Sequence, residues 1–177
     1  MGKIYTALGL MSGTSMDGVD ASIISSDGDR EYSIKIEKYF EYSNELRQNI
    51  INIRDKVFLI DDLKAHSDEI KSLERELTLF HVKVVNEIIK TSKIEVDLLG
   101  FHGQTIFHDP EKKITKQLGD GKLLSQLTKK KVIYNFRHII CIKLPTCKLG
   151  AVLSKPIYAL IFFLSNRSDN SFSFVHW

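Results

Sequence analysis

The stretch with the most chemical content is Gly9 to Asp20, whose sequence is GLMSGTSMDGVD. Gly13 and Gly18 can adopt positive φ and let a bound group approach the backbone closely. Thr14 and Ser15 supply hydroxyl groups, and successive N–H groups in such a turn can form a concavity that binds anions. These residue types suit a loop that binds phosphate groups.

Two carboxylates lie in the same stretch, at Asp17 and Asp20. A carboxylate repels a phosphate, but either one could bind a metal ion that accompanies the phosphate. The pattern is not a Walker loop, because no Lys follows the glycines, and it is not the dinucleotide pattern G-x-G-x-x-G. Small polar residues also suit a tight hairpin turn without a ligand, so the residues alone leave both interpretations open.

Apolar, β-prone runs on both sides of this stretch predict a strand at 3–11, a turn, and a second strand at 19–25. The segment Ser-Asp-Gly-Asp at 26–29 predicts another turn before a strand at 32–42. We therefore expect the loop of Gly13 to Asp20 in a hairpin, with its N–H groups directed into an open cleft.

Helices are predicted next along the chain. Asn44 can cap a short helix that ends near Ile53, and a longer helix is expected at 61–91 with a break near Ser67. Apolar residues recur along the longer helix at intervals of three and four, which indicates one buried stripe: Ile70, Leu73, Leu77, Phe80, Val84 and Ile88. His81 lies beside this stripe and is interpreted as a packed or partly exposed histidine rather than a ligand.

A second polar segment, His102-Gly103-Gln104-Thr105, follows a predicted buried strand at 96–101. Ligands of sheets with parallel pairing tend to bind at the carboxyl ends of strands. Gly103 permits close approach, Gln104 can donate and accept at once, and Thr105 adds a hydroxyl. These groups match the hydroxyls and acetamide of a sugar, although a polar transition from strand to turn is the alternative.

The rest of the pattern predicts short elements. Strands at 106–108 and 114–118 are expected around a turn at Asp109-Pro110. Asp120 is expected to cap a helix at 122–128, because its carboxylate suits the open N–H groups and the helix dipole. A strand at 132–136 then ends before Arg137.

Composition bounds the class of protein. The chain has 177 residues and a net charge of +3, which does not indicate a nucleic-acid partner. Cys141 and Cys147 lack metal-binding spacing, residues 4–11 do not form a secretory signal, and the apolar run at 157–164 is too short to span a membrane. We expect a cytoplasmic protein with one domain, or one domain and a fragment, and no membrane partner.

The string GLMSGTSMDGVD resembles the first phosphate-binding loop of the anhydro-N-acetylmuramic acid kinases, within the hexokinase–actin superfamily. The strings GFHGQTIFHDP, QLGDG and VIYNFR resemble later segments of that family, in the family's order. The resemblance covers residues 1 to about 137. It implies an α/β fold, the N-terminal domain of a hexokinase/actin-like (ribonuclease H-like) fold with a mixed sheet flanked by helices.

The resemblance also implies an activity. Such a kinase uses ATP and Mg²⁺ to phosphorylate 1,6-anhydro-N-acetylmuramic acid while water opens the anhydro bridge, which gives N-acetylmuramic acid 6-phosphate in peptidoglycan recycling. It further implies a homodimer. The residues implied for ATP are Gly13, Thr14, Ser15, Met16, Asp17, Gly18, Val19 and Asp20, and those implied for the sugar are His102, Gln104 and Thr105. The metal ligands stay unassigned.

Two features of the family have no match in this sequence. The catalytic base of the family is an aspartate in the second half of its members, next to a further Gly-rich nucleotide loop. Neither motif is found here, so no catalytic residue is identified. A catalytically inactive remnant without the second domain, or one half of a split enzyme, are therefore alternatives to an active kinase.

The chain changes character after Arg137. Residues 1–137 carry 21 acidic and 21 basic side chains, whereas residues 138–177 carry four basic ones and a single acidic one, Asp169. We therefore divide the chain into a kinase-like domain at 1–137 and a divergent tail at 138–177, which is expected to pack poorly. A change of reading frame in the gene would produce this break, and so would a sequencing error.

Overall fold

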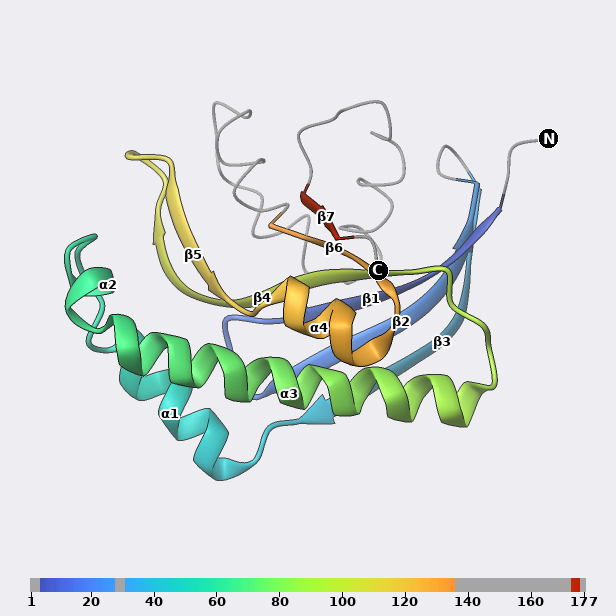
Figure 1. Cartoon of the computed structure of the whole chain (residues 1–177), viewed down its shortest axis with the longest axis horizontal. Helices are drawn as coiled ribbons and strands as arrows, with labels where there is room; N and C mark the ends of the chain where they lie inside the picture. The colour runs from blue at the N-terminus through green and yellow to red at the C-terminus, as the bar shows by residue number, and fades with distance from the viewer. Residues whose placement is uncertain (1–3, 28–30, 136–172, 176–177) are drawn as a thin grey trace.

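The computed structural model describes residues 4–27, 31–135 and 173–175 (Figure 1). The strands are β1 (Tyr5–Ser12), β2 (Gly18–Ser26), β3 (Tyr32–Glu41), β4 (Leu98–Asp109), β5 (Ile114–Leu118), β6 (Lys131–Tyr134) and β7 (Ser173–Val175). The helices are α1 (Asn44–Arg54), α2 (Asp62–Ala65), α3 (Ser67–Ser92) and α4 (Gly121–Thr128).

All the described strands belong to one mixed sheet. Its order is β3-β2-β1-β4-β6-β7, and β5 pairs with β4 away from this path. β1 and β2 form an antiparallel hairpin in which Met11 pairs with Asp20, so the predicted hairpin is confirmed. β4 runs parallel to β1 on one side and to β6 on the other. An α/β fold with a mixed sheet, as expected from the sequence, is confirmed.

Helix α3 runs along one side of the sheet, and α1 and α4 pack against it (Figure 1). The predicted apolar stripe of α3 faces the core, since all its members except Phe80 are at most 5 % exposed. Phe80 is partly buried and packs against the same core. The helices therefore cover one face of the sheet, as their amphipathic pattern requires.

Two helix boundaries differ from the sequence-based expectation or refine it. Ser43, rather than Asn44, caps α1, because its extended backbone lets Ser43 Oγ accept from the Leu46 N–H at 3.2 Å. The expected break in the long helix is found at His66, between the end of α2 and the start of α3.

β4 is the main correction to the predicted elements. The sequence predicts a strand that ends at Phe101, but β4 continues to Asp109 and includes the segment predicted as a separate strand at 106–108. The reason is a change of pairing partner, since β4 pairs in parallel with β1 and β6 near Phe101 and then antiparallel with β5. The segment His102 to Thr105 therefore lies inside a strand and not at its end.

The predicted strand at 132–136 corresponds to β6, and its last residue and Arg137 lie outside the described residues. The predicted tail at 138–177 also lies outside them, apart from Ser173–Val175, which pairs antiparallel with β6. Among the helices that the structure describes, none combines the length and the apolar character needed to cross a membrane.

Candidate phosphate-binding site

The loop between β1 and β2 is a tight turn. The Met16 N–H donates to the Gly13 carbonyl at 3.3 Å. Met16 adopts a left-handed backbone with φ 56°, whereas neither Gly13 nor Gly18 has positive φ. The Met16 side chain is 3 % exposed, so it anchors the turn in the core while Thr14 and Ser15 stay exposed.

The two glycines of the loop have different surroundings. A Cβ on Gly18 would lie 2.4 Å from the Phe40 carbonyl oxygen, so the packing of β3 requires a glycine there. A Cβ on Gly13 would lie 3.4 Å from Ser15 Oγ and 4.0 Å from Ser15 N, which are ordinary contacts. Packing among the described residues thus explains Gly18 but not Gly13, and no described backbone or side chain other than Ser15 lies close to a Cβ at Gly13.

Asp17 is the charged group at the end of the turn. Ser15 Oγ donates to Asp17 Oδ1 at 2.6 Å, and this bond is the main reason that the pKa of Asp17 is lowered. The Tyr39 hydroxyl and the positive charge of Arg47 act in the same direction, against the effect of burial. Asp17 is therefore ionised at neutral pH.

Asp20 gives the site a second carboxylate. The pKa of Asp20 is raised, mainly because its carboxyl group is partly desolvated and also because the negative charges of Asp17 and Glu37 are near. In the described part of the chain, no three His, Cys, Asp or Glu side chains are grouped to hold a metal. Mg²⁺, however, often binds one or two carboxylates together with phosphate oxygens, so Asp17 and Asp20 fit that mode of binding.

Gln104 connects the loop to the second polar segment. Ser12 pairs with Gln104 in the parallel register of β1 and β4. Gln104 Nε2 donates to the Gly13 carbonyl at 2.9 Å, and its side chain is fully buried. Gln104 Oε1 has no hydrogen-bond partner among the described residues. The fold thus brings two segments together that lie about 90 residues apart in the sequence.

His102 and Thr105 are also more buried than a strand end would be, at 5 % and 9 % exposed. His102 Nδ1 donates to the Gly103 carbonyl at 2.7 Å, and Thr105 Oγ1 accepts from Gln117 Nε2 at 3.3 Å. Gly103 has φ 72°, and a Cβ there would lie 2.3 Å from the Leu118 carbonyl oxygen. The atoms that come close to Gly103 therefore belong to β5, whereas the sequence led us to expect a ligand there.

A cluster of three buried polar side chains, Ser12, Tyr42 and His81, adjoins the loop and is not predicted from the sequence. Ser12 Oγ accepts from the Tyr42 hydroxyl at 2.9 Å and lies 3.2 Å from His81 Nε2. The only signal in the sequence was the place of His81 beside the apolar stripe. His81 is packed, as expected, and fully buried rather than partly exposed. Burial lowers the pKa of His81 to about 4 and raises that of Tyr42, so both are neutral at pH 7.

Helix α3 also holds the loop that precedes α4. The Gly119 N–H donates to Glu74 Oε1 at 3.2 Å, and the Asp120 N–H donates to Thr78 Oγ1 at 3.0 Å. Asp120 caps α4 as predicted, since its Oδ1 accepts from the N–H groups of Lys122 and Leu123. Polar side chains of α3 therefore bond to the loop before α4 and, through His81, to the end of β1.

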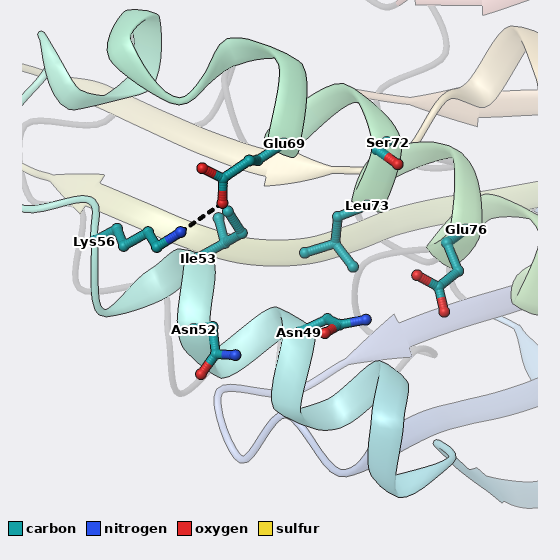
Figure 2. A pocket seen from close by; sticks show the side chains of 8 residues that line it. All are labelled: Asn49, Asn52, Ile53, Lys56, Glu69, Ser72, Leu73 and Glu76. Atoms are coloured by element: carbon teal, nitrogen blue, oxygen red, sulfur yellow. Dashed lines mark hydrogen bonds and ion pairs between the residues drawn. The ribbon is translucent and has the colours of Figure 1, made fainter.

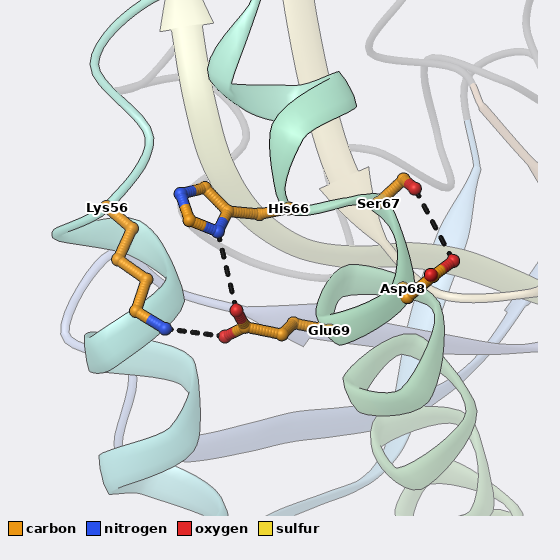
Figure 3. A network of polar contacts seen from close by, with 5 residues as sticks. All are labelled: Lys56, His66, Ser67, Asp68 and Glu69. Atoms are coloured by element: carbon orange, nitrogen blue, oxygen red, sulfur yellow. Dashed lines mark hydrogen bonds and ion pairs between the residues drawn. The ribbon is translucent and has the colours of Figure 1, made fainter.

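A pocket of about 300 Å³ lies elsewhere, between α1 and α3 (Figure 2). Lys56 Nζ contacts Glu69 Oε2 at 2.6 Å across it, and Glu69 Oε1 lies 3.4 Å from His66 Nδ1 (Figure 3). The hydrogen bond from Lys56 is the main reason that the pKa of Glu69 is lowered. This network joins the turn after α1 to the start of α3 at the surface and contains none of the predicted site residues. The pocket is not the open cleft that we expect at the loop of Gly13 to Asp20, and that cleft stays a prediction.

A model of the family described as anhydro-N-acetylmuramic acid kinase matches residues 5–141. The chain belongs to the anhydro-N-acetylmuramic acid kinase family. The matched residues include β1 to β6, so they contain both the loop at Gly13 and the polar segment around Gln104. The resemblance inferred from the sequence motifs is therefore confirmed, and the sheet is that of an N-terminal domain of this family.

Similar proteins from several bacteria carry the name anhydro-N-acetylmuramic acid kinase. The protein from Pelagibacter ubique is 59 % identical over 138 residues, which are 78 % of this chain and 37 % of the relative. The protein from Gluconobacter oxydans is 42 % identical, over 74 % of this chain and 36 % of the relative. The Agrobacterium fabrum protein is 36 % identical, over 77 % and 38 %. The chain thus spans less than two fifths of the length of these relatives.

Proposed function

We propose that the chain carries the first phosphate-binding loop and part of the sugar site of a kinase that acts on 1,6-anhydro-N-acetylmuramic acid. ATP supplies the phosphoryl group, and Mg²⁺ neutralises charge on the phosphates during transfer. The product is N-acetylmuramic acid 6-phosphate, within peptidoglycan recycling. The proposed protein is cytoplasmic and homodimeric, and it acts on this small sugar without a nucleic-acid or membrane partner.

One observation carries the proposal, the hydrogen bond from Gln104 to the Gly13 carbonyl. It joins the segment proposed for phosphate to the segment proposed for sugar, which the sequence alone cannot place side by side. Phosphoryl transfer requires the two substrates to meet with their reacting atoms in line, so neighbouring sites are a condition for this chemistry.

The residues divide into two proposed sets. Around the phosphates, the exposed hydroxyl of Thr14 and those N–H groups of residues 13–20 that are not bonded within the chain donate hydrogen bonds. The Ser15 hydroxyl, which donates to Asp17, orients that carboxylate. Asp17 and Asp20 are the candidate ligands for Mg²⁺. On the sugar side, Oε1 of the buried Gln104 has no hydrogen-bond partner in the described part of the chain, and it is the proposed acceptor for an N–H or O–H group. The residues proposed to accompany Gln104 there are His102 and Thr105.

The alternatives to an active kinase are an inactive remnant and one half of a split enzyme. They stand beside the kinase proposal because the chain covers 37 % of its Pelagibacter ubique relative. The experiment is a chimera in which the aligned segment of that relative is replaced by the matching segment of this chain. Sugar-dependent release of ADP is then measured for the chimera, for this chain, and for this chain mixed with the remainder of the relative.

Turnover by the chimera that is lost in a Gly13→Val variant of it supports the proposed function. A chimera that folds and is inactive, beside an active relative, contradicts the proposal. Turnover by the mixture identifies a half that can work with a separate partner. Turnover by the chimera but not by the mixture indicates a domain that is competent only within one continuous chain.

A further inference from the structure

Three buried side chains beneath the loop form a hydrogen-bond chain whose direction can be derived. His81 Nδ1 lies 2.8 Å from the Leu77 carbonyl oxygen, which can only accept, so Nδ1 carries the proton. In the neutral ring, Nε2 is then an acceptor, and Ser12 Oγ donates to it at 3.2 Å. The Tyr42 hydroxyl donates in turn to Ser12 Oγ at 2.9 Å.

Each of these three side chains depends on the others for a hydrogen-bond partner. Ser12 is 2 % exposed, Tyr42 is 4 % exposed and His81 is fully buried, so water does not replace a lost partner readily. A buried donor or acceptor without a partner costs more free energy than the bond itself contributes. The three groups therefore select one arrangement of the strand end, and a rotated Ser12 or a displaced Tyr42 is disfavoured.

The hydrogen bonds of Ser12 and Tyr42 hold both ends of the loop. Ser12 is the last residue of β1 and directly precedes Gly13. At the other end, the Tyr42 N–H donates to the Asp17 carbonyl at 2.8 Å. Tyr42 thus holds the start of the loop through its hydroxyl and the end of the loop through its main chain.

Aromatic contacts fix the two rings from the side. The Tyr42 ring packs edge to face on Phe80 with centroids 5.0 Å apart, and the His81 ring packs in the same way on Phe101 at 4.9 Å. Each ring therefore has a contact on α3 or β4 that helps to set its position.

We propose that His81 and Tyr42 are positioning residues, which hold both ends of the loop from Gly13 to Asp17 in the conformation that binds phosphate groups. The proposal rests on the proposed function for its ligand. Neither residue touches the ligand, because both are buried. Their role is to set where the N–H groups and hydroxyls of the loop point, and to remove the entropy cost of ordering the loop when the phosphate binds.

The test uses the full chain and two measurements. The first, without any ligand, is amide hydrogen exchange at Met16 and at residue 42, whose N–H groups bond to the loop carbonyls. The second is the dissociation constant for Mg·ATP. The variants are His81→Phe, which keeps a ring but removes the acceptor, Tyr42→Phe, which removes one oxygen atom, and His81→Gln, whose amide oxygen can accept from Ser12.

The control is Ile88→Ala, on the same helix and equally buried, two turns from His81. His81→Phe and Tyr42→Phe are expected to raise exchange at both loop amides about tenfold relative to the amides of β1, and to weaken Mg·ATP about tenfold. His81→Gln is expected to stay near the wild type. Ile88→Ala is expected to lower the melting temperature without a specific effect on the loop.

The two proposals fail in different ways. Loop exchange that is faster only in His81→Phe and Tyr42→Phe supports the positioning role, even if the wild type does not bind Mg·ATP, which would contradict the proposed function instead. Equal effects of Ile88→Ala and His81→Phe on the loop would overturn the positioning role, because general loss of packing would then suffice. Unchanged exchange in a folded Tyr42→Phe would overturn it as well.

Discussion

At the scale of single residues, Gly13 and Gly18 allow a matched comparison within one loop. Gly13→Ala places a methyl group where the nearest atom is 3.4 Å away, so the free energy of unfolding should change by less than about 1 kcal/mol. Affinity for Mg·ATP should still fall, because the methyl group occupies the space proposed for phosphate. Calorimetric titration and thermal unfolding of the same sample measure both effects.

Gly18→Ala is the counterpart. Its methyl group would lie 2.4 Å from the Phe40 carbonyl oxygen, so stability should fall by about 2 kcal/mol or more.

If Gly13→Ala binds Mg·ATP as tightly as the wild type, the space over Gly13 is not a phosphate site.

The buried His81 predicts a pH dependence of stability. Its pKa is lowered from 6.5 to about 4, so between these values the unfolded chain binds a proton that the folded chain does not. Stability should therefore fall as the pH drops through this window, by about 3 kcal/mol in total if this group acts alone. Urea unfolding at several pH values between 7 and 4 measures the slope.

Carboxylates also titrate near the lower end of that window, so the variant His81→Gln is needed for comparison. It has no titrating ring and should lose the part of the slope between pH 6.5 and 5. Identical slopes in both proteins would mean that His81 takes up a proton as easily in the folded state as in the unfolded state.

At the scale of elements, α3 is both a core helix and a scaffold for two loops. Its apolar stripe packs on the sheet, while Glu74, Thr78 and His81 bond to the loop before α4 and to the end of β1. These three residues recur at intervals of four and three, so they lie along one face of the helix. The helix therefore fixes two separate loops relative to each other and to β4.

The start of α4 tests this arrangement. Asp120→Ala removes the carboxylate that accepts from Lys122 and Leu123 and should lower stability by about 1 kcal/mol, whereas Asp120→Asn keeps an acceptor and should lower it less. Chemical unfolding of both variants measures the difference. Equal losses would mean that the charge of Asp120, rather than its hydrogen bonds, stabilises the helix start.

At the scale of the whole molecule, the chain spans less than two fifths of the length of the relatives it matches. We expect the 177-residue chain alone to give no sugar-dependent release of ADP above background, because no residue in it matches the catalytic aspartate or the second nucleotide loop of the family. A coupled assay with ATP, Mg²⁺ and the anhydro sugar measures this. Turnover that disappears in a Gly13→Val, Asp17→Ala double variant would contradict the expectation.

Local sequence patterns determined most of the elements. The hairpin, the amphipathic stripe of α3, the break before it and the cap of α4 follow from interactions between residues close in sequence, which is why they could be predicted. The string around Gly13 likewise indicated the family, because its glycines, hydroxyls and carboxylates stand next to each other in the chain.

Tertiary structure decided what depends on partners distant in sequence. β4 extends past Phe101 because β5 pairs with it, and Gln104 is buried because β1 lies beside β4 in parallel. The bonds of Ser12 to Tyr42 and His81 join residues 30 and 69 positions apart. No local pattern encodes such contacts, since they are stable only when the sheet and α3 together exclude water from all three groups.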